Sequence, residues 1–375
     1  MANEAESQDA SSVLRFVAGF GLPGGAAACN DEPLPDRIWA SVLADTRYQR
    51  LAGLLMAAVE AGALHVTDDQ RAEVEELHLG ACGAVLRLER RLVEVALLLD
   101  AAGIEVVVLK GTAVAHLAYP DPAMRMFGDN DLLLRSEQFD DAVELLCHNG
   151  YVRQTAPARP GFERRFAKGT TLDGAAGDEL DLHRNLVFGT FGFRIDLDEL
   201  FRTAVPFEVG GRVLHGLGPE TRLLHACYHA GLGDPRPRFG SVRDVAQMLT
   251  FGAHDPSGVL ALARAWESDA VLARAVQLCE DLLGYRPDDE VARAIRGHAP
   301  TARERRAIDS YVGENRRFAA KVVASLPYID GVGAKAAFVT SVAFPQQGFA
   351  ESFGGRSGIA WLLRGARSLL RGGGR

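Results

Sequence analysis

The chain has 375 residues, of which 47% are hydrophobic and 24% charged, close to the averages of soluble globular proteins, which excludes a disordered chain, a collagen-like repeat and a coiled coil. Its net charge of −8 argues against a protein that coats duplex nucleic acid, because such a protein carries an excess of positive charge. The five cysteines contain no C-x-x-C pair, and no signal peptide or membrane-spanning segment is evident. We therefore expect a cytoplasmic protein with two or three domains and reduced thiols.

The first part of the chain is predicted to be helical after a flexible start. Residues 1–34 combine an acidic beginning with a Gly/Ala-rich stretch, and we expect them to form a flexible N-terminal segment. Apolar residues then recur at three- and four-residue spacing over 36–64, and again in a longer helix over about 69–102. Residues 35–102 are therefore predicted to form an N-terminal helical region.

A new pattern begins at Gly103 with the run IEVVVL, which is rich in β-branched residues and too short for a buried helix. Segments typical of strands and helices then alternate, so residues 103–217 are predicted to form an α+β or α/β domain. The expected strands are 104–109, 129–134, 162–167, 179–183 and 212–214, and the expected helices are 112–119 and 136–149.

The remaining chain is predicted to be helical. Residues 218–325 show helical periodicity and should form an all-α C-terminal domain. The tail, residues 326–375, ends in an apolar stretch with five arginines and one acid. A basic amphipathic helix of this kind can lie on a membrane surface, although a docked terminal helix is the more common outcome, so we expect at most weak membrane contact.

Carboxylates stand at positions where strands would present them together. Side chains two residues apart in a strand point to the same face, so Asp129 and Asp131 are expected to project side by side. The segment ELDLH alternates polar and apolar residues, which places Glu179, Asp181 and His183 on one face. Adjacent carboxylates repel each other unless a cation lies between them, so the arrangement suits Mg²⁺. For the same reason, removing the pair is expected to cost the metal-free fold little.

An anion-binding turn is predicted just before these carboxylates. Lys110, Gly111 and Thr112 lie where a strand runs into a helix, and the backbone N–H groups, hydroxyl and ammonium of such a turn favour phosphate. Gly111 permits close approach of a ligand. Arg125 lies just ahead of the acidic strand, where it is expected either to contact a triphosphate or to pair with Asp121.

The order of these segments resembles the nucleotidyltransferase fold of the DNA polymerase beta superfamily: a strand, a turn with glycine and a hydroxyl residue, a D-x-D pair and a later strand carboxylate. The runs LKGTAVAHLAYPDPAMRMFGDNDLLL, ELDLH, LLHACYHAGLG and SVRDVAQML resemble more closely a bacterial family of uncharacterised nucleotidyltransferases. The resemblance covers about residues 35–345. Asn130 departs from the superfamily, which usually has an apolar residue between the two aspartates.

This resemblance implies an α+β fold with a nucleotidyltransferase-type mixed sheet and flanking helices. It also implies Mg²⁺-dependent transfer of a nucleoside monophosphate from an NTP to an acceptor hydroxyl or phosphate, with release of pyrophosphate. Two Mg²⁺ ions, or Mn²⁺ in their place, would be held by Asp129, Asp131 and Asp181. Residues 110–112 would hold the β- and γ-phosphates, with Arg125 nearby.

The acceptor is expected to be a small molecule, a peptide or a protein rather than RNA, and no stable complex with duplex nucleic acid is expected. A small basic group, Arg164, Arg165 and Lys168, is predicted either to contact phosphate or the acceptor, or to lie as ordinary charges at a sheet edge.

Two other functions fit parts of the sequence. His225 and His229 stand four residues apart on a predicted helix and, with Asp244, have the spacing of zinc ligands in a metallohydrolase. Residue 226 is alanine, however, so the glutamate of the H-E-x-x-H motif is absent. A pair formed by Arg243 and Asp244 is expected to bond back to these histidines. The other alternative is a non-catalytic nucleotide-binding or interaction protein with the same fold.

Overall fold

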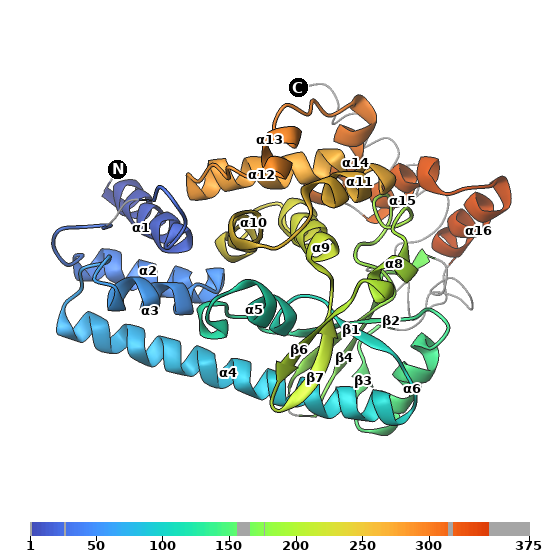
Figure 1. Cartoon of the computed structure of the whole chain (residues 1–375), viewed down its shortest axis with the longest axis horizontal. Coiled ribbons are helices and arrows are strands. Elements are labelled where there is room, and N and C mark those ends of the chain that lie inside the picture. The colour runs from blue at the N-terminus through green and yellow to red at the C-terminus, as the bar shows by residue number, and fades with distance from the viewer. Residues whose placement is uncertain (1, 26–27, 156–165, 176, 314–317, 345–375) are drawn as a thin grey trace.

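The fold is organised around a seven-stranded mixed sheet (Figure 1). The structure, a computed structural model, describes residues 2–25, 28–155, 166–175, 177–313 and 318–344. The strands are β1 Val106–Val108, β2 Asn130–Leu134, β3 Val152–Arg153, β4 Gly169–Asp173, β5 Glu179–His183, β6 Val205–Val209 and β7 Arg212–Gly216. Their order is β3-β4-β5-β2-β1-β7-β6, in which β2 runs parallel to β5 and β1 to β7 while the other pairs are antiparallel. The predicted α+β class is confirmed.

Helices precede the sheet, cover it and follow it along the chain (Figure 1). They are α1 Ala2–Gly19, α2 Asp36–Gln49, α3 Ala52–Glu60, α4 Asp68–Ala101, α5 Thr112–Ala118, η1 Pro122–Met124, α6 Phe139–His148, α8 Leu197–Arg202, α9 Pro219–Leu232, α10 Phe239–Phe251, α11 Pro256–Ala265, α12 Asp269–Leu283, α13 Glu290–Ile295, α14 Ala302–Val312, α15 Phe318–Ser325, η2 Leu326–Tyr328 and α16 Val332–Ala343. Within the described ranges, no helix has the length and apolar character that crossing a membrane requires. The predicted basic helix of the tail falls on residues 345–375, outside the described residues.

The two faces of the sheet contribute to different cores, because side chains alternate along each strand. Leu132 and Leu134 of β2 pack with the second half of α4 and with α6. Leu133 points to the opposite face and belongs to the larger core, which continues into helices before and after the sheet. Asp131 shares that second face with Leu133, so its carboxylate is directed away from α4 and α6. The larger core contains residues from all three predicted regions, so it does not separate one region from the next. The boundaries at residues 102, 217 and 325 stay predictions.

The helical stretch before α4 is interrupted where the sequence predicted one helix over 36–64. α2 ends at Gln49, and the next residue, Arg50, adopts a left-handed conformation with φ 60° and ψ 42°. The N–H groups of Arg50 and Leu51 close the helix end by donating to carbonyl oxygens of its last turn. α4 begins with a capping box in which Thr67 and Gln70 satisfy each other's backbone N–H groups.

More than half of the segment predicted to be flexible, residues 1–34, is helical, because α1 spans Ala2–Gly19. The flexibility of the rest of the segment stays a prediction. Val13 and Val17 of α1 are buried in the larger core, and α1 packs on α2, α10 and α12. The run SSVLRFVAGF does carry apolar residues at helical spacing, but Arg15 interrupts it and weakens the signal. In the structure, Arg15 donates to the carbonyl oxygen of Asp281 in α12. The residue that interrupts the apolar pattern therefore connects α1 with α12.

The outer part of the sheet also differs from the prediction. The expected strand over 162–167 falls mostly on residues outside the described ranges, and the strand present, β4, begins at Gly169. Gly169 lies so close to β5 that a Cβ atom there would come within 1.9 Å of the Leu182 carbonyl oxygen. The sequence does not predict β3 or β6. β3 is two residues long and β6 contains Pro206, which argues against a strand unless the strand lies at a sheet edge.

Candidate active site

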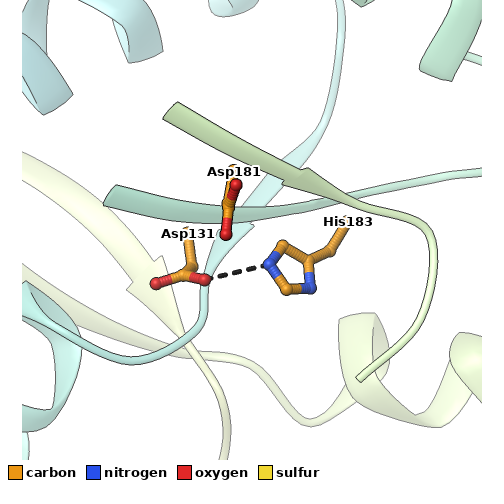
Figure 2. Close-up of side chains that lie close together, drawn as sticks. All are labelled: Asp131, Asp181 and His183. Atoms are coloured by element: carbon orange, nitrogen blue, oxygen red, sulfur yellow. Dashed lines mark hydrogen bonds and ion pairs between the residues drawn. The ribbon is translucent and has the colours of Figure 1, made fainter. Parts of the chain in front are cut away.

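Two carboxylates lie opposite each other in neighbouring parallel strands. Asp131 of β2 is the direct partner of Asp181 of β5, and Leu133 is the partner of His183. Asp181 and His183 are two residues apart and therefore share a face of β5. Asp131, Asp181 and His183 each offer one ligand atom, and these atoms lie within 4.8 Å of one another (Figure 2). Among the described residues, they form the one cluster of three or more such side chains that is close enough to hold a metal ion.

Asp131 is buried and has one oxygen with partners and one without. Its Oδ1 lies 2.9 Å from the ammonium nitrogen of Lys110 and 2.9 Å from Nε2 of His183. Burial by itself raises the pKa of Asp131, but the charge of Lys110 and the hydrogen bond with His183 outweigh burial and hold the pKa well below its usual range. No described residue donates a hydrogen bond to the buried Oδ2. An ionised oxygen is costly to bury without a partner, so Oδ2 is available to a cation or a ligand.

Lys110 connects Asp131 with Asp129, the residue that immediately precedes β2. The ammonium nitrogen lies 3.5 Å from Asp129 Oδ2, and Asp129 Oδ1 lies 3.5 Å from the guanidinium of Arg50. Burial lowers the pKa of Lys110, but the two aspartates more than compensate and raise it. Lys110, predicted to hold phosphates, therefore directs its ammonium group to carboxylates and offsets their repulsion. The predicted repulsion between the aspartates is therefore already compensated, and we expect the removal of both to destabilise the fold, because the ammonium would remain partly buried without these partners.

Asp181 is held by the neighbouring strand. The hydroxyl of Thr171 in β4 donates to Asp181 Oδ1 at 2.5 Å. Glu179, which shares the face of Asp181, lies at the exposed start of β5, and Asp178 precedes the strand. Of these three acidic residues, the strand register brings Asp181 opposite Asp131.

Asn130, the polar residue between the two aspartates of the D-x-D pair, has a structural role. Asn130 is buried, and its side-chain amide donates to the carbonyl oxygen of Leu88 in α4 at 2.9 Å. This bond ties β2 to the long helix beneath the sheet. It gives a polar side chain a partner at a position where the superfamily usually has an apolar residue.

The predicted phosphate turn depends on glycine. Gly111 has φ 55° and ψ −117°, which residues with a side chain rarely adopt, and a Cβ atom there would lie 3.2 Å from the Asp129 carbonyl oxygen. Thr112 is 1% exposed, and its hydroxyl has no hydrogen-bond partner among the described residues. A ligand oxygen that reaches this turn can supply the missing partner.

Arg125 is paired within the protein, but not with Asp121. Its guanidinium forms an ion pair with Asp244 of α10, with Nη2 2.8 Å from Oδ2, and donates to the carbonyl oxygen of Gly111 at 3.2 Å. The hydroxyl of Tyr119 also donates to Asp244. Asp121 instead accepts a backbone N–H at the start of η1. Arg125 therefore links the phosphate turn to the C-terminal helices.

A family of known proteins matches most of this chain in sequence. Residues 35–284 match the family described as "Uncharacterised nucleotidyltransferase". The chain belongs to this family of nucleotidyltransferases. A solved structure of an antigenic nucleotidyltransferase-like protein from Paracoccidioides brasiliensis is similar over 53% of this chain and 93% of its own, with 17% identity and a TM-score of 0.34. No curated protein matches the chain. The family predicted from the sequence is confirmed.

The two helical histidines of this nucleotidyltransferase are neutral at pH 7. His225 is buried and His229 half-buried, and burial is the main cause that lowers the pKa of His225 to about 3 and the pKa of His229 well below its usual range. Asp244, the expected third zinc ligand, is engaged in the ion pair described above. Arg243 does not bond back to the histidines as predicted, and donates instead to the carbonyl oxygen of Ala18 at the end of α1.

We predict that the purified protein contains no stoichiometric zinc, and that a zinc-selective chelator leaves its melting temperature unchanged. The reason is that Asp244 is already neutralised by an arginine, so His225 and His229 lack a third ligand from it. Elemental analysis of the wild type and of His225→Ala checks this. One tightly held zinc ion per chain that disappears in His225→Ala would restore the metallohydrolase alternative.

Two further residues belong to the site: His183, whose role the sequence left open, and Lys168, which was predicted either to contact phosphate or the acceptor or to lie at a sheet edge. The alternation of ELDLH places His183 on the face of Asp181, but its contact with Asp131 depends on which strands are neighbours. Burial, followed by the charge of Lys110, lowers the pKa of Lys168, which also interacts electrostatically with the site aspartates. In the sequence, Lys168 was singled out because it lies in a small group of basic residues.

The other members of that basic group, Arg164 and Arg165, lie outside the described residues.

Proposed function

We propose that this protein is a metal-dependent enzyme that transfers a nucleoside monophosphate from an NTP to an acceptor hydroxyl or phosphate and releases pyrophosphate. The observation that supports it best is the pairing of Asp131 with Asp181 in parallel strands, next to His183. Two carboxylates held side by side are the arrangement that nucleotidyl transfer requires for its divalent ions.

The residues at the site fit a divalent metal ion. Oδ2 of Asp131 is buried and has no hydrogen-bond partner among the described residues, and Asp181 and His183 offer ligand atoms within 4.8 Å. Asp129, on the same side as Asp131 through their shared contact with Lys110, is the further carboxylate that we assign to metal binding. Carboxylate oxygens suit Mg²⁺, and the imidazole nitrogen of His183 makes Mn²⁺ a good alternative. When bound, two such ions neutralise the phosphate charge and lower the pKa of the acceptor group.

The remaining site residues are assigned to the triphosphate and to the acceptor. The Thr112 hydroxyl and the backbone at Gly111 bind phosphate oxygens. The Lys110 ammonium, which contacts Asp129 and Asp131 in the structure, contacts the phosphates when the NTP is bound. Arg125 adds positive charge and holds the Gly111 carbonyl oxygen. Asp181 accepts the proton of the acceptor, whose oxygen forms a bond with the α-phosphorus as the bond to the β-phosphate oxygen breaks and pyrophosphate leaves.

For the acceptor we propose a small molecule, a peptide or a protein, in the cytoplasm. The net charge of −8 disfavours a long polyanion such as RNA. The proposal is tested by incubating the protein with each α-labelled NTP and Mg²⁺ or Mn²⁺, with and without cell extract. Label that moves to a product only when extract is present supports the proposal and leads to the acceptor. No transfer from any NTP with either metal would contradict it.

A non-catalytic nucleotide-binding protein is the second candidate, and the position of Lys110 favours it. A cation supplied by the protein already offsets the repulsion between Asp129 and Asp131, so the pair does not by itself require a metal ion. Metal dependence of NTP binding separates the two functions. The enzyme needs a divalent ion for tight NTP binding, whereas a binding protein that relies on Lys110 does not.

Replacing Thr112 by valine is expected to weaken NTP binding without harming the fold. The hydroxyl is buried and lacks a partner among the described residues, so its removal should leave the free energy of unfolding unchanged or raise it. Loss of a hydrogen bond to a charged phosphate should cost about 1–2 kcal/mol of NTP binding free energy. Calorimetry and thermal melts measure both. Gly111→Val is less informative, since its positive φ strains any side chain.

A Thr112→Val variant that melts earlier but binds NTP normally would contradict the phosphate contact.

A further inference from the structure

A pocket of about 250 Å³ lies beside the candidate active site. Lys110, Asp129 and the segment around Arg125 border it on one side, and its other walls come from the turn between α2 and α3 and from the loop between α9 and α10. Each of these walls contributes an arginine, Arg50 from the turn and Arg238 from the loop. The pocket therefore lies between the sheet and the helices that precede and follow the sheet in the chain.

The turn and the loop are fixed against each other at this pocket. The backbone N–H of Phe239, the first residue of α10, donates to the side chain of Gln49 at 2.9 Å. The next residue, Gly240, packs so closely that a Cβ atom there would lie 2.9 Å from the carbonyl oxygen of Gln49. These contacts bring Arg50 and Arg238 to one pocket from opposite sides.

Arg50 is held in a strained backbone conformation at the pocket. Its φ of 60° lies in the left-handed region, where a helix end usually has glycine. The guanidinium passes over Gly128, where a Cβ atom would come within 3.0 Å of Nη2, and reaches Asp129 Oδ1 at 3.5 Å. The Arg50 side chain remains 39% exposed. A glycine at position 50 would relieve this strain. An arginine in its place indicates that the position requires the guanidinium group rather than the residue best suited to the turn.

Four cationic side chains and two carboxylates, Asp129 and Asp234, line the pocket, and two of its arginines are available to an anion. Arg125 is paired with Asp244 and Lys110 with Asp131, whereas the only ion pair of Arg50 among the described residues is the 3.5 Å contact with Asp129. Arg238 lies over the ring of Tyr48, 5.0 Å from its centroid, and within the described chain no carboxylate pairs with it. The first turn of α10 also lines the pocket, and a helix start favours negative charge.

We propose that this pocket binds the triphosphate of the nucleotide, and that Arg50 and Arg238 hold it from the two helical regions. The assignment rests on the proposed function. The pocket borders Lys110 and Asp129, whereas Gly111 and Thr112 do not line it, so the pocket meets the predicted phosphate turn through Lys110. Asp181 and Thr171 do not line it either, and they lie on the side that we assign to the acceptor. An anionic acceptor would offer the same chemistry, and the experiment distinguishes the two ligands.

Calorimetric titration with inorganic tripolyphosphate, without metal, tests the pocket. Arg50→Gly and Arg238→Gln are each expected to weaken tripolyphosphate binding about tenfold, the scale of one charge-assisted contact. Arg50→Gly should also keep or raise the melting temperature, because glycine suits the left-handed backbone. The matched control is Arg47→Gln, an exposed residue of the same helix outside the pocket, which should bind like the wild type. Unchanged affinity in both pocket variants would overturn the proposal.

Competition with a non-hydrolysable NTP analogue identifies the ligand. Mutual exclusion of tripolyphosphate and the analogue supports the triphosphate assignment, and simultaneous binding overturns it in favour of an anionic acceptor. The outcome also separates this inference from the proposed function. Wild-type transfer with unchanged tripolyphosphate affinity in Arg50→Gly and Arg238→Gln would contradict the anion site alone. Weakened affinity in these variants, without any transfer by the wild type, would contradict nucleotidyl transfer and leave the anion site in place.

Discussion

Replacing Asp129 and Asp131 together by asparagine is expected to abolish metal-dependent NTP binding and nucleotidyl transfer. Both carboxylates contact Lys110, and Asp131 also belongs to the cluster with Asp181 and His183. Loss of groups that only support metal ligands commonly costs 10–100-fold in metal affinity, so loss of two ligands should cost about 100-fold or more. Calorimetry with a non-hydrolysable NTP analogue, with and without Mn²⁺ or Mg²⁺, measures the effect.

Asparagine is the informative substitution because alanine also damages the fold. Asp131 is fully buried and paired with Lys110, so Asp131→Ala leaves an ammonium group partly buried without its closest partner and should cost on the order of 3 kcal/mol of unfolding free energy. Asparagine keeps the volume of the side chain and an oxygen that can accept a hydrogen bond. Asp198→Asn, at an exposed position, is the control. Unchanged metal-dependent affinity in the folded double variant would contradict the metal assignment.

Replacing Asp181 by asparagine is expected to lower turnover by a factor of about 10² to 10⁴, the range for loss of a general base. The parallel register places Asp181 directly opposite Asp131, and Thr171 fixes its carboxylate. NTP affinity should change little, because we assign the triphosphate to other residues. The measurement is turnover together with NTP affinity.

Glu179→Gln and Asp178→Asn are the matched controls for Asp181→Asn. Glu179 shares a face with Asp181 but lies at the exposed start of β5, and Asp178 precedes the strand and bonds to the Tyr151 hydroxyl. Both variants should stay active. A fully active Asp181→Asn together with an inactive Glu179→Gln would mean that the register is off by one pair and that the acceptor lies nearer the start of β5. Full activity of all three variants would mean that the third carboxylate lies elsewhere.

The local parts of the site could be predicted from the sequence because strand alternation determines which side chains share a face. That rule places Asp129 on the side of Asp131, and His183 on the side of Asp181. The rule carries no information on which strands are neighbours. β3 and β4 come between β2 and β5 in the chain, yet β2 and β5 are paired in the sheet, so the contact between Asp131 and His183 required the topology.

The ion pairs around the site could not be predicted for a related reason. Arg125 has an acidic neighbour in the sequence, Asp121, but pairs with Asp244, which α10 brings to it from 119 residues away. Lys110 stands in a turn that suits phosphate, yet its ammonium group lies nearest to a buried carboxylate. Spacing along the chain cannot rank such partners, because the pairing depends on which charges the fold buries together.

The position of the label in the transferred group tests nucleotidyl transfer most directly. Parallel reactions with α-labelled and γ-labelled NTP, Mn²⁺ or Mg²⁺ and cell extract should place the α label on the acceptor and the γ label in pyrophosphate. The Asp129→Asn/Asp131→Asn variant should give neither product. Transfer of the γ label to the acceptor would contradict the account, because the bond broken would then be the one between the β- and γ-phosphates.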